Sequence, residues 1–120
     1  MSKNSIEKWL ESLRSAWEGC DVDAALSLFA DKVEYWESPW HLVAPEDLNN
    51  LWQSIRVDRQ TKVSTEVVFS SDNDHAVIWS ATWYDESGLA RTKQGTYFVR
   101  LDNSCLCEYF YRTSMEQKEE

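Results

Sequence analysis

Four segments in the second half of the chain most constrain its fold, because apolar and polar residues alternate along each of them. This alternation is typical of β-strands with one buried face, and it predicts strands over residues 61–70, 75–84, 91–101 and 105–112. The segments between them are rich in Asp, Asn, Ser and Gly, which favour turns. Because short turns join consecutive strands only when these run in opposite directions, we expect an antiparallel meander.

The first half of the chain shows helical spacing instead. Apolar residues recur at the spacing of a helix face over residues 4–18, 22–30 and 45–57. Asp21 can cap the second of these helices, and Pro45 fits the first position of the third. Each helix has a single apolar stripe, so all three can lie on the same face of the sheet.

A short strand is expected between the second and third helices, at residues 33–38, where aromatic and β-branched residues dominate. Pro39 cannot donate a ladder hydrogen bond and should end this strand, after which the chain stays irregular through Ala44. The resulting order, α-α-β-α-β-β-β-β, predicts an α+β domain in which the helices cover one face of an antiparallel sheet.

Length and charge limit the organisation and the partners of this chain. Its 120 residues fit one domain, over residues 1–115, followed by a charged tail at 116–120. The formal net charge of -9 disfavours binding to nucleic acid or to an anionic membrane surface, because both rely on cationic side chains. No apolar stretch approaches the ~20 residues that a membrane span needs.

The cysteines and the N-terminal sequence predict a cytoplasmic protein without metal or cofactor. An odd number of cysteines and the lack of a secretory signal favour free thiols in a reducing compartment. Cys105 and Cys107 lack the further Cys and His partners of a zinc site. The sequence has no glycine-rich phosphate loop and no nucleophile elbow around a serine.

Residues 33–41 are the strongest candidate for a functional site, since they combine aromatic rings, two carboxylates and an imidazole. Glu34 and Glu37 lie on opposite faces of the expected strand, so one of them should point into the interior beside aromatic rings. Burial there would raise the pKa of the carboxyl group, which suits a general acid or base near neutral pH. In the alternative interpretation, both glutamates reach water or a lysine. His41 could exchange a proton with Glu37 at the pocket rim, or be an exposed loop histidine.

Aromatic side chains supply the candidate lining of a pocket. Trp79 and Trp83 project from one strand face with the small Ala81 between them, which leaves room for a flat apolar ligand. Tyr97 could add a hydroxyl group. Core packing or a subunit interface would explain the same rings, because tryptophan is also enriched at interfaces. The candidate ligand-binding residues are Trp36, Trp40, Trp79, Trp83 and Tyr97.

Residues 23–31 (DAALSLFAD) run into residues 33–36 (VEYW) and then into a Ser-Pro pair at 38–39. This stretch resembles the SnoaL-like branch of the nuclear-transport-factor-two-like superfamily, in which a short helix with a similar ending leads into the first strand and a proline. Residues 79–83 and 95–99 are similar to central strands of the same proteins. The resemblance implies a cone-shaped, strongly curved antiparallel sheet wrapped around three helices, with a pocket open at one end.

Members of this superfamily include isomerases, cyclases, dehydratases and epoxide hydrolases. Others are binding domains without activity, and many members form dimers through the outer face of the sheet. Two positions depart from the catalytic patterns that the resemblance implies. Ser38 occupies the place of the base Asp in the steroid-isomerase-like members, and Phe110 occupies the place of an acid in the last strand. The nearest acids are Glu37 and Glu108.

The residues and the resemblance together predict a small-molecule-binding domain with an aromatic pocket. If the domain is catalytic, we expect cofactor-free proton transfer on an apolar cyclic substrate. Glu37 is then the preferred acid–base group, with Glu34 second and His41 assisting. The alternative is a non-catalytic homodimeric module that binds a ligand or another protein. A homodimer formed through the sheet face is expected in either case.

Overall fold

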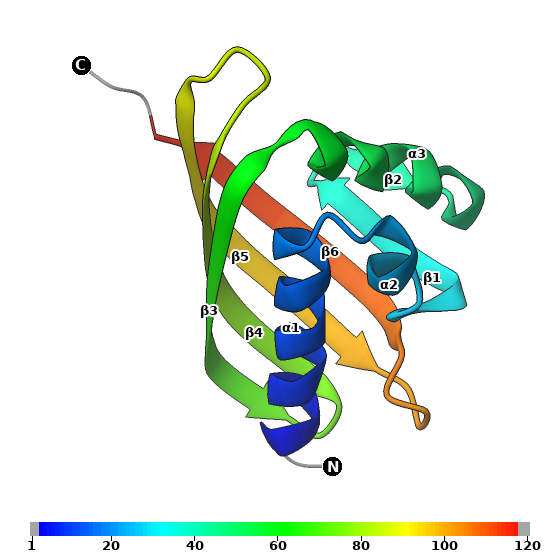
Figure 1. The fold of residues 1–120 in the computed structure, drawn as a ribbon. Helices are drawn as coiled ribbons and strands as arrows, with labels where there is room; N and C mark the ends of the chain where they lie inside the picture. The colour runs from blue at the N-terminus through cyan, green and yellow to red at the C-terminus, as the bar shows by residue number, and fades with distance from the viewer. Residues whose placement is uncertain (1–2, 118–120) are drawn as a thin grey trace.

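The chain folds into one curved six-stranded sheet with helices on its concave face (Figure 1). The structure is a computed structural model that describes residues 3–117. The helical elements are α1 (Lys3–Glu18), α2 (Val22–Leu26), η1 (Pro45–Asp47), α3 (Leu48–Trp52) and η2 (Gln53–Val57). The strands are β1 (Phe29–Ser38), β2 (His41–Val43), β3 (Arg59–Ser71), β4 (Asp74–Tyr84), β5 (Ala90–Leu101) and β6 (Cys107–Glu116). The predicted α+β architecture, with helices in the first half and a strand meander in the second, is confirmed.

The strands lie in the order β2-β1-β6-β5-β4-β3, and β3 to β6 form the expected antiparallel meander. β1 pairs in parallel with β6, with Tyr35 opposite Phe110 and Trp36 opposite Tyr111. This pairing joins the first long strand of the chain to its last strand. Side chains from both ends of the sequence therefore share one wall of the interior.

The boundary between α2 and β1 differs from the expectation. The second helix ends at Leu26, and residues 29–30, predicted as helix, already belong to β1. The Phe29 ring packs edge-on against Trp9 and Phe110, with ring centroids 5.6 and 5.5 Å apart. Tertiary packing of Phe29 thus outweighs the local helical spacing.

At two other places the structure has strand residues where no strand was predicted. The segment after Pro39, predicted to be irregular, contains β2, which turns back onto β1 with Val43 opposite Tyr35. β6 continues to Glu116, where this residue forms an ion pair with Arg91 of β5. The predicted charged tail therefore begins inside a strand, and its last three residues lie outside the described part of the chain.

Gly95 lets β5 and β6 approach each other closely. It lies opposite Ser114 of β6 and opposite Trp79 of β4, and Trp79 Nε1 donates a hydrogen bond to the Thr113 carbonyl at 3.1 Å. A Cβ atom at position 95 would lie 1.8 Å from that carbonyl oxygen. The missing side chain therefore allows the indole to cross β5 and fixes Trp79 in the core.

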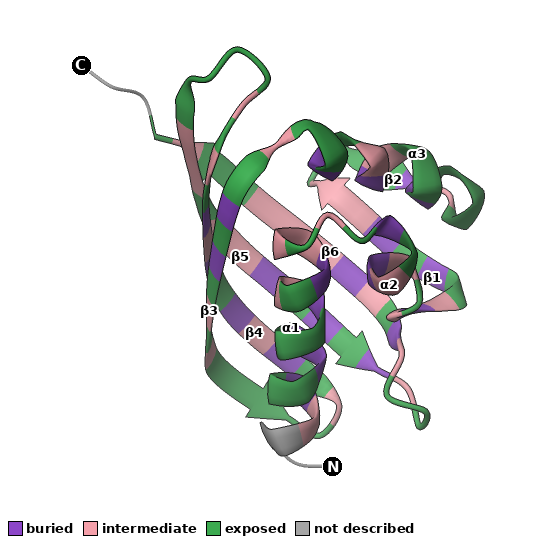
Figure 2. Cartoon of the chain, in the orientation of Figure 1, coloured by how far each residue is buried: buried purple, intermediate pink, exposed green. Residues whose placement is uncertain are grey.

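Side chains on the concave face form the core, and buried residues alternate with exposed or half-buried ones along β4 and in the last part of β5 (Figure 2). Trp79, Tyr97 and Phe110 are almost inaccessible to solvent, and Ile6 and Leu13 of α1 belong to the same buried cluster. Within residues 3–117, no helix is both long and apolar enough to cross a membrane.

A candidate ligand-binding pocket

A pocket opens where α3 and η2 meet the sheet, and its cavity volume is about 140 Å³. Six aromatic rings line it: Trp17, Tyr35, Trp52, Trp83, Tyr97 and Phe110. Its charged lining consists of Glu37, Asp58, Lys93 and Arg112. The pocket combines apolar walls with a few polar groups, which is the usual composition of a small-molecule site. Among the described residues, no three His, Cys, Asp or Glu side chains gather in a way that could hold a metal ion.

An ion pair between Glu37 of β1 and Arg112 of β6 forms one side of the pocket. Arg112 Nη1 donates to Glu37 Oε2 at 2.7 Å, and the Arg112 and Glu37 side chains are 15% and 26% exposed, respectively. The guanidinium also lies over the Trp79 ring, with Cζ 4.7 Å from the ring centroid. Burial lowers the pKa of the Arg112 guanidinium, but the opposing effects of Glu37, Tyr97 and Tyr35 together outweigh burial, so the pKa is raised. Glu37 is therefore a paired carboxylate and not an isolated one.

Two tyrosines stand beside this ion pair. Tyr97 stacks on Trp79 with ring centroids 5.4 Å apart, and Tyr35 stacks on Phe110 at 4.8 Å. Burial raises the pKa of both hydroxyl groups above the ordinary value for tyrosine. Both hydroxyls are thus protonated at neutral pH and can donate a hydrogen bond to a bound molecule or accept one from it.

Asp58 directly follows η2 and lies on the more exposed side of the pocket, together with Lys93 and Trp83. The Cys20 thiol donates to the carbonyl of Ile55 at 3.1 Å and to that of Asp58 at 3.8 Å, which holds the backbone between η2 and β3. The Asp58 carboxylate has neither a hydrogen bond nor an ion pair within the described part of the chain. Cys20 thus contacts the backbone at Asp58, while the Asp58 carboxylate stays unpaired.

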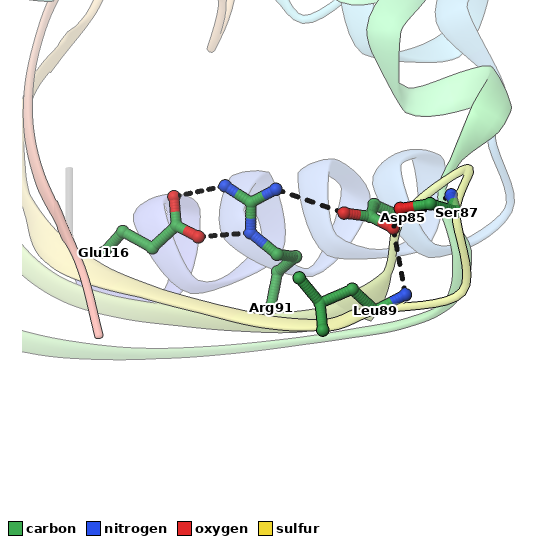
Figure 3. Close-up of polar contacts among 5 residues, drawn as sticks. All are labelled: Asp85, Ser87, Leu89, Arg91 and Glu116. Atoms are coloured by element: carbon green, nitrogen blue, oxygen red, sulfur yellow. Dashed lines mark hydrogen bonds and ion pairs between the residues drawn. The ribbon is translucent and has the colours of Figure 1, made fainter. Parts of the chain in front are cut away.

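A second charged network joins the start of β5 and the end of β6 to the turn after β4 (Figure 3). Arg91 of β5 donates to Asp85 Oδ2 at 3.2 Å and to Glu116 Oε1 at 2.6 Å. The Leu89 backbone N–H donates to Asp85 Oδ1 at 3.0 Å and is the main cause of the lowered pKa of the Asp85 carboxyl. Arg91 is therefore held between two carboxylates.

The structure places three of the predicted site residues in the pocket lining, namely Glu37, Trp83 and Tyr97. Trp79 lies behind the lining, buried under the Arg112 guanidinium. This arrangement follows from strand alternation, because Glu37 shares a face with the buried Tyr35. The roles of these residues in binding or catalysis remain predictions.

The other four predicted site residues lie away from the pocket. Glu34 and Trp36 lie on the outer face of β1, where Trp36 Nε1 donates to Glu34 Oε2 at 2.8 Å. Trp40 is 90% exposed, and His41 is exposed in β2. No hydrogen bond joins His41 to Glu37, both of which the structure describes. The predicted proton exchange between them thus lacks a direct contact.

Arg112 and Asp58 are the charged pocket residues that the sequence interpretation did not identify. Arg112 lies two positions after Phe110 in the last strand, so alternation alone places both side chains on one face. Asp58 lies between a helical segment and a strand, where the sequence has no periodicity that would indicate the direction of a side chain.

The architecture is that of the NTF2-like proteins, as solved structures that cover nearly the whole chain show. Δ5-3-ketosteroid isomerase from Mycobacterium sp. is 15% identical with a TM-score of 0.76, over 94% of this chain and 98% of its own. AusH from Aspergillus nidulans is 11% identical with a TM-score of 0.83, over 99% and 89%. An NTF2-like protein of unknown function from Exiguobacterium sp. is 13% identical with a TM-score of 0.72, over 92% and 98%.

These similarities establish the fold of the chain. Neither a protein-family model nor a curated protein matches its sequence. The chain therefore has the NTF2-like cone fold that the resemblance implied, and its function has to be argued from the pocket itself.

Proposed function

We propose that the chain binds a small, flat, mostly apolar organic molecule in the aromatic pocket. The observation that carries this proposal is the ring of six aromatic side chains around a cavity that also holds an ion pair and two tyrosine hydroxyls. A ketosteroid isomerase shares the fold, which supports the use of this cone for a small molecule.

The cavity volume limits the ligand to one ring or two fused rings. An engineered apolar cavity of about 150 Å³ binds benzene, and this pocket measures about 140 Å³. Pockets for drug-sized molecules are larger, roughly 300–1,000 Å³. A four-ring molecule would therefore require the α3–η2 segment to move outward.

The polar groups favour a neutral ligand that has a hydrogen-bonding group. Two buried polar atoms have no hydrogen-bond partner among the described residues: the acceptor Glu37 Oε1 and the donor Arg112 Nε. The hydroxyl groups of Tyr35 and Tyr97 can each donate or accept a hydrogen bond. Because the charges of Glu37 and Arg112 cancel, this wall attracts neither cations nor anions strongly.

Binding of the two-ring ketone indan-2-one is expected to shift the NMR signals of a defined set of indole N–H groups. The signals of Trp17, Trp52 and Trp83, which line the pocket, should shift in a saturable manner. Those of Trp36 and Trp40, which lie outside it, should not. Single Trp→Phe variants assign the signals. Saturable shifts confined to Trp36 and Trp40, or no saturable shift, would contradict the proposal.

A variant that fills the pocket provides the control. Ser54 lines the pocket and is exposed, so a tryptophan ring there would occupy the cavity. Ser54→Trp should therefore weaken the affinity for indan-2-one by at least about tenfold, which corresponds to a loss of about 1.4 kcal/mol of binding free energy. Asn50→Trp adds the same ring at an exposed position outside the lining and should leave binding unchanged.

A second candidate function, a homodimeric module, is favoured by a row of apolar residues on the outer face of the sheet. The strand register connects one residue of every strand into this row: Leu42, Trp36, Tyr111, Phe98, Ala76 and Phe69. Rings in the row touch, with centroids 6.2 Å apart for Trp36–Tyr111 and 6.0 Å for Phe98–Tyr111. A groove of about 640 Å³ lies beside the small Ala76. We propose that a second copy of the chain covers this row, with each copy presenting the same face.

Phe98→Lys should convert the proposed dimer into a monomer, because it places a charge at the centre of the apolar row. Phe98 is 46% exposed, so the change should leave the fold intact. Sedimentation equilibrium measures the mass. Gln94→Lys, on the same face of β5 but outside the row, is the control and should stay dimeric. A wild-type protein that sediments as a monomer at high concentration would exclude this candidate function.

A further inference from the structure

We infer that the molecule bound in the pocket is a cyclic amide, held by its N–H and C=O groups against Glu37 and Arg112, an inference that rests on the proposed binding function. The ion pair between these residues is formed by one hydrogen bond, from Arg112 Nη1 to Glu37 Oε2 at 2.7 Å. A carboxylate and a guanidinium can each form several hydrogen bonds. Glu37 Oε1 and Arg112 Nε are buried without a partner among the described residues. The ion pair therefore keeps a free acceptor beside a free donor.

The free acceptor and the free donor belong to one connected group of atoms. Oε1 shares the Glu37 carboxylate with Oε2, Nε shares the Arg112 guanidinium with Nη1, and the hydrogen bond joins the two groups. Both residues line the pocket, so a bound molecule can approach them from there. Buried polar groups in folded proteins nearly always have a partner, because an unpaired one costs stability. A ligand that carries a donor and an acceptor side by side would pair with both residues at once.

The strands place an aromatic surface directly next to this ion pair. Tyr35 of β1 lies opposite Phe110 of β6, and their rings stack with centroids 4.8 Å apart. Glu37 and Arg112 come two positions further along the same strands, so they project from the same face as these rings. All four residues line the pocket. A flat ligand can therefore place its rings against the aromatic pair and its polar edge against the ion pair.

A cyclic amide has the polar edge that this wall requires. The ring holds the N–H and C=O groups on the same side of the molecule, so the N–H can donate to Glu37 while the C=O accepts from Arg112. The hydrogen bond to the carboxylate is charge-assisted and therefore stronger than one between neutral groups. A simple ketone has the acceptor alone. A carboxylic acid is ionised near neutral pH, and its negative charge would face that of Glu37.

Oxindole and indan-2-one test the inference on the wild-type protein, because they differ only in the exchange of one ring CH₂ for N–H. Without a partner for the N–H group, this exchange should weaken binding, since a polar group would be buried unpaired. With Glu37 as the partner, oxindole should bind about tenfold more tightly or better. Both affinities are measured from the tryptophan indole N–H signals. N-methyloxindole lacks the donor and should lose the advantage.

Glu37→Gln tests which residue binds the N–H group of the ligand. Because Arg112 can only donate, the new carboxamide should turn its oxygen toward the guanidinium and present its NH₂ group in place of the free acceptor. The preference for oxindole over indan-2-one should therefore disappear. Glu34→Gln makes the same change on the outer face of β1, where Glu34 accepts from Trp36, and it should keep the preference.

The outcomes separate this inference from the proposed function. If indan-2-one binds but oxindole binds no more tightly, the assignment of a cyclic amide is overturned and the binding function stands. A preference for oxindole that survives Glu37→Gln overturns the assignment as well, and so do equal affinities for oxindole and N-methyloxindole. If neither oxindole nor indan-2-one binds, both proposals are overturned.

Discussion

Replacing Gly95 with alanine should destabilise the protein by about 3 kcal/mol or more. This is a large share of the roughly 5–15 kcal/mol that separates the folded and unfolded states of a domain. The added Cβ would lie 1.8 Å from the Thr113 oxygen and 2.9 Å from Ser114 Cα, both of which are backbone atoms that no side-chain rotation can move. Relief requires β5 and β6 to separate, which would also break the hydrogen bond of Trp79. Urea unfolding followed by circular dichroism measures the loss.

Gly88→Ala is the control for adding a methyl group to a glycine. A Cβ atom added to Gly88 would have no other residue within 4 Å apart from its chain neighbours, but the φ of +85° at this position is unfavourable for alanine. This substitution should therefore cost about 1–2 kcal/mol through the backbone alone. If Gly95→Ala costs no more than Gly88→Ala, the close approach of the two strands does not determine stability.

Replacing Arg112 with methionine should lower the free energy of unfolding by about 2–3 kcal/mol. Removal of one partner from a fully buried ion pair typically costs about 3–5 kcal/mol. The smaller loss is expected because the Arg112 and Glu37 side chains both keep some exposure. The variant leaves the Glu37 carboxylate among aromatic rings without its cation. It also removes the guanidinium from the face of Trp79. Thermal and urea unfolding of the purified variant measure the effect.

The double variant Glu37→Gln/Arg112→Met distinguishes the loss of charge pairing from the loss of packing. Because it removes both charges, it should be more stable than Arg112→Met alone. Equal stability of the single and double variants would show that the contact of the Arg112 side chain with Trp79, and not its charge, provides the stabilisation.

Much of the fold could be predicted because local signals and tertiary structure agree in the second half of the chain. The alternation over residues 75–84 reappears as β4, and the turns rich in Asp and Asn separate the strands as expected. β2 was missed because three residues next to Pro39 are too few to show a period. The parallel pairing of β1 with β6 has no local signature, since it depends on where two remote segments meet.

The candidate site was only partly predictable for a related reason. Alternation showed that Glu34 and Glu37 face opposite sides, but Tyr35 and Trp36 are both aromatic and therefore do not indicate which face is buried. The helices decide this, because the face of Tyr35 is the one that they cover. Arg112 ends the predicted strand but lies in the middle of the observed β6, and its burial becomes evident only beside Glu37.

The parallel pairing of β1 and β6 also sets an order of events while the chain is being made. Glu37 and Arg112 are 75 residues apart, and contacts of such long separation form slowly. Until residues 107–116 leave the ribosome, β1 can pair only with β2, and its tyrosine and tryptophan side chains stay open to water and to other nascent chains. The growing polypeptide thus acquires its cavity only once β6 has emerged and paired with β1.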